Sequence, residues 1–172
     1  MTARSAHLFL RRAWLAALPL WAGACVAPVA PQFEDPTGNY SPYLVSSDPP
    51  AGSVLSTGTP IVAATLADPN LQDDLYGRWL IDYPPYDDSR SRLALEFRLP
   101  PSDAVDRETV RFAPNCAEDQ IAASLDSHRV TLSVADRPFV PPEQAPADLR
   151  LDTVPDDGFL LRATWILNLT CP

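Results

Sequence analysis

Apolar and polar residues alternate with a period of two along much of the chain after residue 42. Successive side chains of a β-strand point to opposite faces of its sheet, so this period predicts strands with one buried face. The segment 92–99, for example, places Leu93, Leu95, Phe97 and Leu99 on one face. The whole pattern predicts seven strands, at 43–46, 60–66, 76–83, 92–99, 108–113, 128–136 and 159–169.

Two of these segments carry a tryptophan on the face that is expected to be buried. In 76–83 the inward residues would be Trp79, Ile81 and Tyr83. In 159–169 they would be Phe159, Leu161, Ala163, Trp165, Leu167 and Leu169. The segment 117–125 begins with acids and has few β-branched residues, which favours a helical turn there.

The predicted strands resemble the immunoglobulin-like domains of envelope proteins. The sequence Ser47-Asp-Pro-Pro-Ala-Gly52 is similar to the opening of many bacterial modules of this kind. The rhythm of 128–136, His-x-Val-x-Leu-x-Val-x-Asp, is similar to the sixth strand of immunoglobulin-like, fibronectin-like and PKD-like domains. The resemblance implies an all-β fold, a Greek-key β-sandwich of about seven strands over 43–172. It implies no chemistry, because a fold does not fix a function.

The N-terminus has the three zones of a secretory signal. A lead with Arg4, Arg11 and Arg12 precedes an apolar run over 13–24, and small residues stand just before Cys25. A membrane-spanning helix needs about 20 apolar residues, so this run is too short to be a stable span. Residues 1–24 are therefore predicted to be a cleaved signal peptide.

The sequence Ala22-Gly-Ala-Cys25 resembles the lipobox of bacterial lipoproteins, although a leucine or larger aliphatic residue is more usual at the first position. The resemblance implies that Cys25 is acylated, for example with palmitate, and anchors the mature chain to a membrane. Val26 in place of an aspartate implies the outer membrane of a bacterial cell envelope. The alternative is an ordinary secretory signal that is cut elsewhere.

Residues 25–42 are predicted to be a proline-rich tether between the anchor and the domain. Prolines at 28, 31, 36 and 42 block regular hydrogen bonding and favour an extended chain that rises about 3.1 Å per residue. The alternative, a ligand for a proline-binding groove, is less suited to an envelope compartment. The expected organisation is 1–24 signal peptide, 25–42 tether and 43–172 β-sandwich domain.

The chain is acidic, and its only basic side chains besides two histidines are thirteen arginines, which give a net charge of −9. Removal of 1–24 would leave ten arginines against 22 acidic residues, a net charge of −12. Such a surface repels phosphates and anionic lipid headgroups, so no nucleic acid partner is predicted. The predicted partners are the lipid bilayer, through Cys25, and a protein of the envelope.

Cys116 and Cys171 remain as an even pair if Cys25 is lipidated. In an oxidising compartment a disulfide is the default state of neighbouring thiols, so the two are predicted to pair. The loop that this bond closes would give roughly 4 kcal/mol of stabilisation in the chain-entropy account.

Two acidic loops, 68–74 and 137–157, are expected at one end of the sandwich. They concentrate carboxylates, of which Asp68, Asp73, Asp74, Asp156 and Asp157 are candidate binding residues. Several carboxylates together suit Ca²⁺ or a basic partner surface. The favoured interpretation is that these loops are acidic only because they are solvated.

At the opposite end, Tyr83 and Tyr86 in the sequence Tyr-Pro-Pro-Tyr are candidate binding residues, because aromatic rings stack on sugars and anchor protein contacts. The favoured interpretation is a stiff turn in which Tyr83 is partly buried. His128 is predicted to be a surface or edge residue, and no motif places a nucleophile beside it. No catalytic residue and no cofactor is predicted. The expected function is a non-enzymatic structural or protein-binding module, with a carbohydrate- or peptidoglycan-binding module and a small envelope hydrolase as alternatives.

Overall fold

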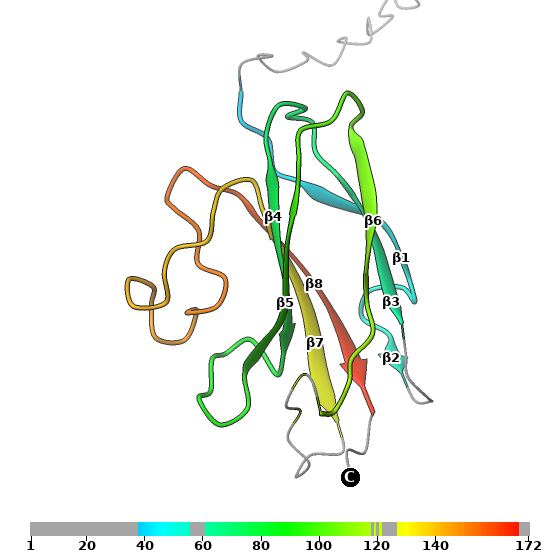
Figure 1. Cartoon of the computed structure of the whole chain (residues 1–172), viewed down its shortest axis with the longest axis vertical. Helices are drawn as coiled ribbons and strands as arrows, with labels where there is room; N and C mark the ends of the chain where they lie inside the picture. Colours follow the sequence, from blue (N-terminus) through cyan, green and yellow to red (C-terminus); the bar gives the residue numbers. More distant parts are fainter. Residues whose placement is uncertain (1–37, 56–60, 118, 120, 122–126, 169–172) are drawn as a thin grey trace, which may run out of the picture. The chain divides into compact units, whose positions relative to one another are not determined.

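The described residues of the computed structural model are 38–55, 61–117, 119, 121 and 127–168. After Gly38 the chain forms one compact unit that begins at Asn39, ahead of the predicted boundary at residue 43. Its strands are β1 (Tyr43–Asp48), β2 (Val54–Leu55), β3 (Val62–Ala67), β4 (Leu75–Ile81), β5 (Arg92–Leu99), β6 (Asp106–Phe112), β7 (His128–Ala135) and β8 (Leu160–Leu167). Figure 1 shows β3 to β8 as long, roughly aligned arrows and β2 as a short one.

The strands form two sheets. One has three antiparallel strands in the order β1-β3-β6, and the other has five in the order β2-β8-β7-β4-β5. All pairs in the larger sheet are antiparallel except β2 with β8, which is parallel. The prediction of an all-β fold is confirmed for the described residues, in which all seven expected strands are present and the two-residue β2 is an addition.

The hydrophobic core lies between the two sheets, as in a β-sandwich. Trp79 on β4 is fully buried, and its ring stacks on Phe112 of β6, in the other sheet, with centroids 5.3 Å apart. Trp165 on β8 lies 5.7 Å from the Trp79 ring and donates its indole N–H to the carbonyl of Pro49. The alternation of β7 is confirmed, because Val130, Leu132 and Val134 all belong to this core.

The alternation of β5 is interrupted, contrary to the prediction. Trp79 pairs with Leu95 and Leu80 pairs with Leu93, so Ala94 is an extra residue in a β-bulge. Leu93 is thereby turned to the outer face, and Leu95, although it shares the face of Trp79, lies on an edge strand. Both leucines are 43% exposed, while Ala94 and Phe97 pack against the core. A bulge of one residue reverses the pattern of the strand beyond it.

A second reversal occurs where β4 ends. Asp82 adopts a left-handed backbone conformation with φ of 52°, which few residues other than glycine, asparagine and aspartate tolerate. Tyr83 is therefore fully buried outside the core, on the opposite face of the five-stranded sheet. Its predicted place beside Trp79 and Ile81 is wrong. Phe159 is also misplaced by the simple alternation, since β8 begins only at Leu160 and Phe159 is 40% exposed.

Some predictions fall outside the described residues. They are the signal peptide, the lipobox cysteine Cys25, most of the tether, most of the helical turn at 117–125, and Cys171. Within the described part of the chain, no helix is both long enough and apolar enough to cross a membrane.

Candidate functional site

The loops at one end of β4 and β7 form what we call the Asn39 pole, which consists of Asn39, the loop 68–74 and residues 136, 137 and 157. The side-chain amide of Asn39 donates to Asp136 at 2.7 Å and to the carbonyl of Asp157 at 3.3 Å. Its oxygen accepts a hydrogen bond from the Asn70 side chain at 2.5 Å. The two acidic loops thus lie together, as predicted, and the chain enters the domain between them.

A buried ion pair lies beneath the Asn39 pole. Asp68 is fully buried, and its carboxylate accepts the backbone N–H of Asn70 at 2.9 Å and the guanidinium of Arg107 at 3.3 Å. Burial raises the pKa of Asp68 despite these contacts. Arg107, whose side chain is 1% exposed, also donates to the carbonyls of Pro100 and Asn70. Asp68 and Arg107 therefore hold the loops 68–74 and 100–105 together, and neither is available to a ligand.

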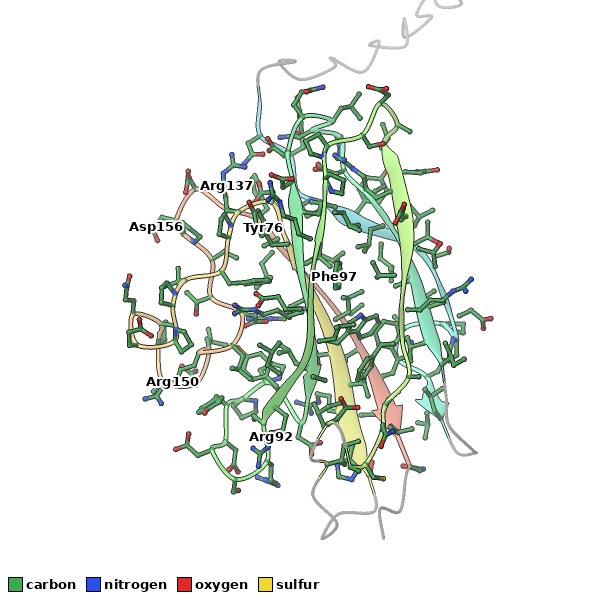
Figure 2. All side chains as sticks on the ribbon, in the orientation of Figure 1. Tyr76, Arg92, Phe97, Arg137, Arg150 and Asp156 are labelled. Carbon is green, nitrogen blue, oxygen red and sulfur yellow. The ribbon has the colours of Figure 1, made fainter. Side chains whose placement is uncertain are left out.

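Of the four other carboxylates predicted to bind at this pole, two are paired with an arginine. The carboxylate of Asp73 pairs with the guanidinium of Arg137 at 3.0 Å, and that of Asp74 pairs with Arg98 at 2.5 Å. Asp156 and Asp157 are exposed, and Figure 2 shows Asp156 on the outer part of the long loop. No group of three or more metal-ligating side chains occurs among the described residues. The geometry at this pole gives the calcium hypothesis no support.

The long loop that follows β7 runs from this pole along the outer face of the five-stranded sheet, beside β4 in Figure 1. Its anchor is Asp152, which is fully buried. The Asp152 carboxylate accepts three hydrogen bonds: from the hydroxyl of Ser133 on β7 at 2.7 Å, from the guanidinium of Arg162 on β8 at 2.6 Å, and from the hydroxyl of Tyr83. Burial, together with the bond to Asp152, raises the pKa of Tyr83. Sequence reasoning treated Asp152 only as one acid of a solvated loop.

Arg78 of β4 provides a second attachment for this loop. Its guanidinium lies 4.3 Å from the centroid of the Phe139 ring and donates to the carbonyl of Leu151 at 2.8 Å. It also pairs with Glu96 of β5 at 2.9 Å. A planar guanidinium stacks on an aromatic ring and donates several hydrogen bonds at once, which the ammonium group of a lysine does less well. The loop 137–157 is thus fixed on the sheet at several points.

At the other end of β4, the loop 82–91 and the start of β7 form what we call the Tyr86 pole. A groove of about 510 Å³ lies there between the loop and the ends of β7 and β8. Its lining comprises Asp82, Pro84, Pro85, Tyr86, Asp87, Arg90, Ser127, His128, Arg129 and Ile166. We call it the Tyr86 groove.

The loop beside the groove is held by its own side chains. Ser91 donates its hydroxyl to the carbonyl of Asp82 at 2.8 Å and accepts the N–H of Asp87 at 2.9 Å. The Asp87 carboxylate accepts hydrogen bonds from Ser89 and Arg90, which lower its pKa to about 2. The backbone N–H of Tyr86 also donates to the carbonyl of Asp148 at 2.9 Å, which connects this loop to the long one. The groove wall is therefore preorganised.

His128 is buried, contrary to the prediction of a surface or edge residue, and is only 1% exposed. Its Nδ1 lies 2.8 Å from Asp82, whose other oxygen accepts the backbone N–H of Arg129 at 3.0 Å. Its Nε2 is buried and has no hydrogen-bond partner in the described part of the chain. A catalytic histidine of a hydrolase would activate a nucleophile within hydrogen-bond reach. Ser127 precedes it in sequence, but no hydrogen bond joins the two side chains.

The two candidate tyrosines lie in different environments. Tyr83 is fully buried under the long loop, which confirms and extends the favoured interpretation that it is partly buried. Tyr86 is half-buried beside the groove, and the guanidinium of Arg150 lies 5.6 Å from its ring centroid. The hydroxyl of Tyr86 forms a hydrogen bond with Asp88, and this bond raises the pKa of Tyr86. Neither ring is a free, flat platform for a sugar.

The arginines are unevenly paired. Six of the ten described arginines contact a carboxylate: Arg78, Arg90, Arg98, Arg107, Arg137 and Arg162. Among the described residues, Arg92, Arg111, Arg129 and Arg150 contact none. Arg92 and Arg129 donate only to carbonyls, those of Asp88, Ser89 and Ser91 and that of Pro84 respectively. Of these four arginines, Arg129 belongs to the Tyr86 pole, and Arg92 and Arg150 lie beside it.

The predicted partner of Cys116, Cys171, is not among the described residues, so their disulfide stays a prediction. Cys116 is partly buried and packs against the core. The sequence Asn39-Tyr-Ser matches a glycosylation pattern, but both hydrogens of the Asn39 amide are engaged at the Asn39 pole.

No protein-family model and no curated protein matches this chain.

Proposed function

We propose that this chain is a lipid-anchored protein of the bacterial cell envelope that acts as a non-enzymatic, protein-binding module. Cys25 carries the lipid in the outer membrane, the segment that follows is the tether, and an immunoglobulin-like domain presents the binding surface. The observation that carries the proposal is that the polypeptide enters the domain at Asn39, while the Tyr86 groove lies at the opposite end of β4. The groove and Asn39, where the chain joins the domain, therefore lie at opposite ends of β4.

The strand order supports the immunoglobulin-like part of the proposal. The sequence β8-β7-β4-β5 corresponds to the G, F, C and C′ strands of a variable-type domain, and β1-β3-β6 corresponds to A, B and E. The buried Trp79 lies on β4, the strand that matches C. A disulfide between Cys116 and Cys171 would tie the chain after β6 to the end of β8.

The environment of the polar side chains supports a binding module over an enzyme. Asp68 with Arg107, and Asp152 with Tyr83 and Arg162, use their polar atoms to hold loops on the sheets. The alternative of a carbohydrate- or peptidoglycan-binding module depended on Tyr83 and Tyr86. It is weakened because Tyr83 is buried and Arg150 lies over the ring of Tyr86.

The test compares the wild-type chain with Cys25→Ser, by mass spectrometry of the intact N-terminus and by crosslinking in native envelopes. We expect a diacylglycerol on Cys25, retention in the membrane fraction, and a protein crosslinked to the wild type. Cys25→Ser should remain unprocessed or be released from the membrane. An unlipidated N-terminus cut elsewhere would refute the anchor, and an envelope in which no protein is crosslinked would refute the binding module.

A further inference from the structure

We propose that the Tyr86 groove binds an extended peptide segment that carries carboxylates, supplied by a protein partner. The inference rests on the proposed function as a protein-binding module and names the chemistry of its ligand. It starts from the unequal pairing of arginines in a chain with a net charge of −9. An acidic protein has carboxylates in excess, so arginines that contact none of them need a reason.

The groove contains one such arginine. Arg129 is exposed at the start of β7 and lines the groove, and its guanidinium donates to the carbonyl of Pro84, which also lines it. A guanidinium has five N–H donors in a planar fork, so a single carbonyl leaves most of them unused. A carboxylate that accepts two of them in parallel forms one of the stronger hydrogen-bonded contacts in proteins.

Two further arginines stand beside the groove. Arg150 lies over the ring of Tyr86, a groove residue, and Arg92 follows the loop 82–91 directly and donates to its carbonyls. Figure 2 shows Arg92 and Arg150 toward the same end of the molecule, whereas Arg137 lies toward the other. An extended segment in the groove would therefore meet a guanidinium inside it and others along its rim.

The acids of the groove are already engaged and do not neutralise these arginines. Asp82 accepts hydrogen bonds from His128 and from the backbone of Arg129. Asp87 accepts hydrogen bonds from the side chains of Ser89 and Arg90. These bonds lower the pKa of Asp87 to about 2, so its carboxyl group stays ionised. Asp88, outside the groove lining, bonds the Tyr86 hydroxyl. Arg129 and Arg150 are exposed and contact no carboxylate of the described residues, and a ligand with carboxylates would complement them.

The remaining lining favours a peptide over a glycan. Pro84, Pro85 and Ile166 offer apolar contacts to an extended chain, and the guanidinium of Arg150 lies over the Tyr86 ring, where a sugar would have to stack. The loop is fixed by Ser91 and by the contact of Tyr86 with the long loop, so little ordering accompanies binding. Preorganisation of this kind raises affinity by lowering the entropic cost of association.

The test measures fluorescence anisotropy of a labelled Gly-Glu-Pro-Glu-Gly peptide and its glutamine counterpart against the full-length lipoprotein in neutral detergent. We expect the glutamate peptide to bind more tightly and to lose affinity as salt rises. Arg129→Glu and Arg150→Glu should each weaken it by about tenfold, a loss of ~1.4 kcal/mol. Arg111→Glu is the matched control, because Arg111 is equally exposed and unpaired but lies on β6 of the other sheet, and its effect should stay within about twofold.

Equal binding of the two peptides, or no binding of either, would overturn the proposal. An equal loss in Arg111→Glu and Arg129→Glu would also do so, because it would show an effect of net charge and not of the groove. Tighter binding of a soluble peptidoglycan fragment than of the peptide would assign the groove to the cell wall instead. Arg129→Gln, with an unchanged melting temperature, separates loss of the contact from loss of folding.

The outcome is distinguishable from failure of the proposed function. If the wild type and Arg129→Glu are crosslinked to the same envelope protein equally well, the groove is not the binding surface and the module stands. If the glutamate peptide binds through Arg129 but no envelope protein is crosslinked, the chemistry of the groove stands and the proposed function fails.

Discussion

At the Asn39 pole charge is buried and paired, whereas at the Tyr86 pole it is exposed and only partly paired. Asp68 and Arg107 are both almost inaccessible, and their contacts join the loops 68–74 and 100–105, each of which runs between the two sheets. Arg129 and Arg150 are exposed, and neither contacts a carboxylate of the described residues. Arginines and aspartates thus stabilise the fold at one end of the domain, where they are buried together. At the other end exposed arginines remain available to a ligand, so the difference lies in solvent access.

The comparison also corrects an expectation based on composition. The acidic loops 68–74 and 137–157 attract attention because they concentrate carboxylates. In the structure four of their eight carboxylates pair with Arg107, Arg137, Arg98 and Arg162 and fix the loops. The better candidate site lies where some arginines contact no carboxylate of the described residues.

The largest expected effect comes from opening the buried pair at the Asn39 pole. Arg107→Met would leave Asp68 buried without its cation, which typically costs 3–5 kcal/mol. Arg111→Met is the control, since Arg111 lies on the same strand and is exposed, and it should cost less than about 0.5 kcal/mol. Urea unfolding of both variants measures the difference.

The loss in Arg107→Met should depend on pH. The pKa of Asp68 is already raised by burial, and removal of a nearby cation raises it further. A raised folded-state pKa favours folding at pH values below the ordinary pKa of 3.8 and loses that contribution as pH rises through the folded-state value. The variant should therefore be closest to wild type in acid. A cost of under about 1 kcal/mol at neutral pH would refute the structural role of this pair.

An intermediate effect is expected where the two poles are connected through the long loop. Tyr83→Phe removes the hydroxyl that donates to buried Asp152 and should cost about 1–3 kcal/mol, as measured by thermal or urea unfolding. Amide hydrogen exchange near 149–153 should become faster, because the loop loses one of its attachments. Tyr86→Phe is the control on the same segment, and it should change stability by less than about 0.5 kcal/mol. Equal effects of the two substitutions would show that Tyr83 does not anchor the loop.

The smallest effect is expected from the exposed carboxylate of the Tyr86 pole. Hydrogen bonds from Ser89 and Arg90 lower the pKa of Asp87 to about 2, so Asp87 should titrate there in a carboxyl-detected NMR experiment. Its stabilising contribution is present above the ordinary pKa of 3.8 and is lost as pH falls toward 2. Arg90→Gln should move the titration of Asp87 upward. An unchanged midpoint in that variant would exclude Arg90 as a cause of the shift.

The period of two was sufficient to locate the strands, because each strand has one face toward the core and one toward solvent or a loop. It placed β5 at 92–99 with the observed bounds and identified Trp79 as a core residue. It failed at Ala94 and at Asp82, where an extra residue and a left-handed backbone reverse the pattern. Neither event has a strong local signal, since alanine and aspartate occur in many conformations.

The candidate site was predicted less well than the fold. The proximity of the two acidic loops followed from the resemblance, and the favoured burial of Tyr83 followed from its place in a proline-stiffened turn. The Tyr86 groove and the burial of His128 were missed, and the only sequence signal for the groove was the Tyr-Pro-Pro-Tyr turn.

The sequence by itself determined the all-β class, the approximate strand positions and the excess of acid, because these depend on local periodicity and composition. It also carries the pattern of the N-terminus, from which the signal peptide and the lipid on Cys25 are predicted. Only the tertiary structure decided which arginine meets which carboxylate. Arg107 and Arg111 are four positions apart on one strand, yet one is buried against Asp68 and the other has no carboxylate partner among the described residues. Pairing depends on contacts between residues far apart in the chain, which no local pattern encodes.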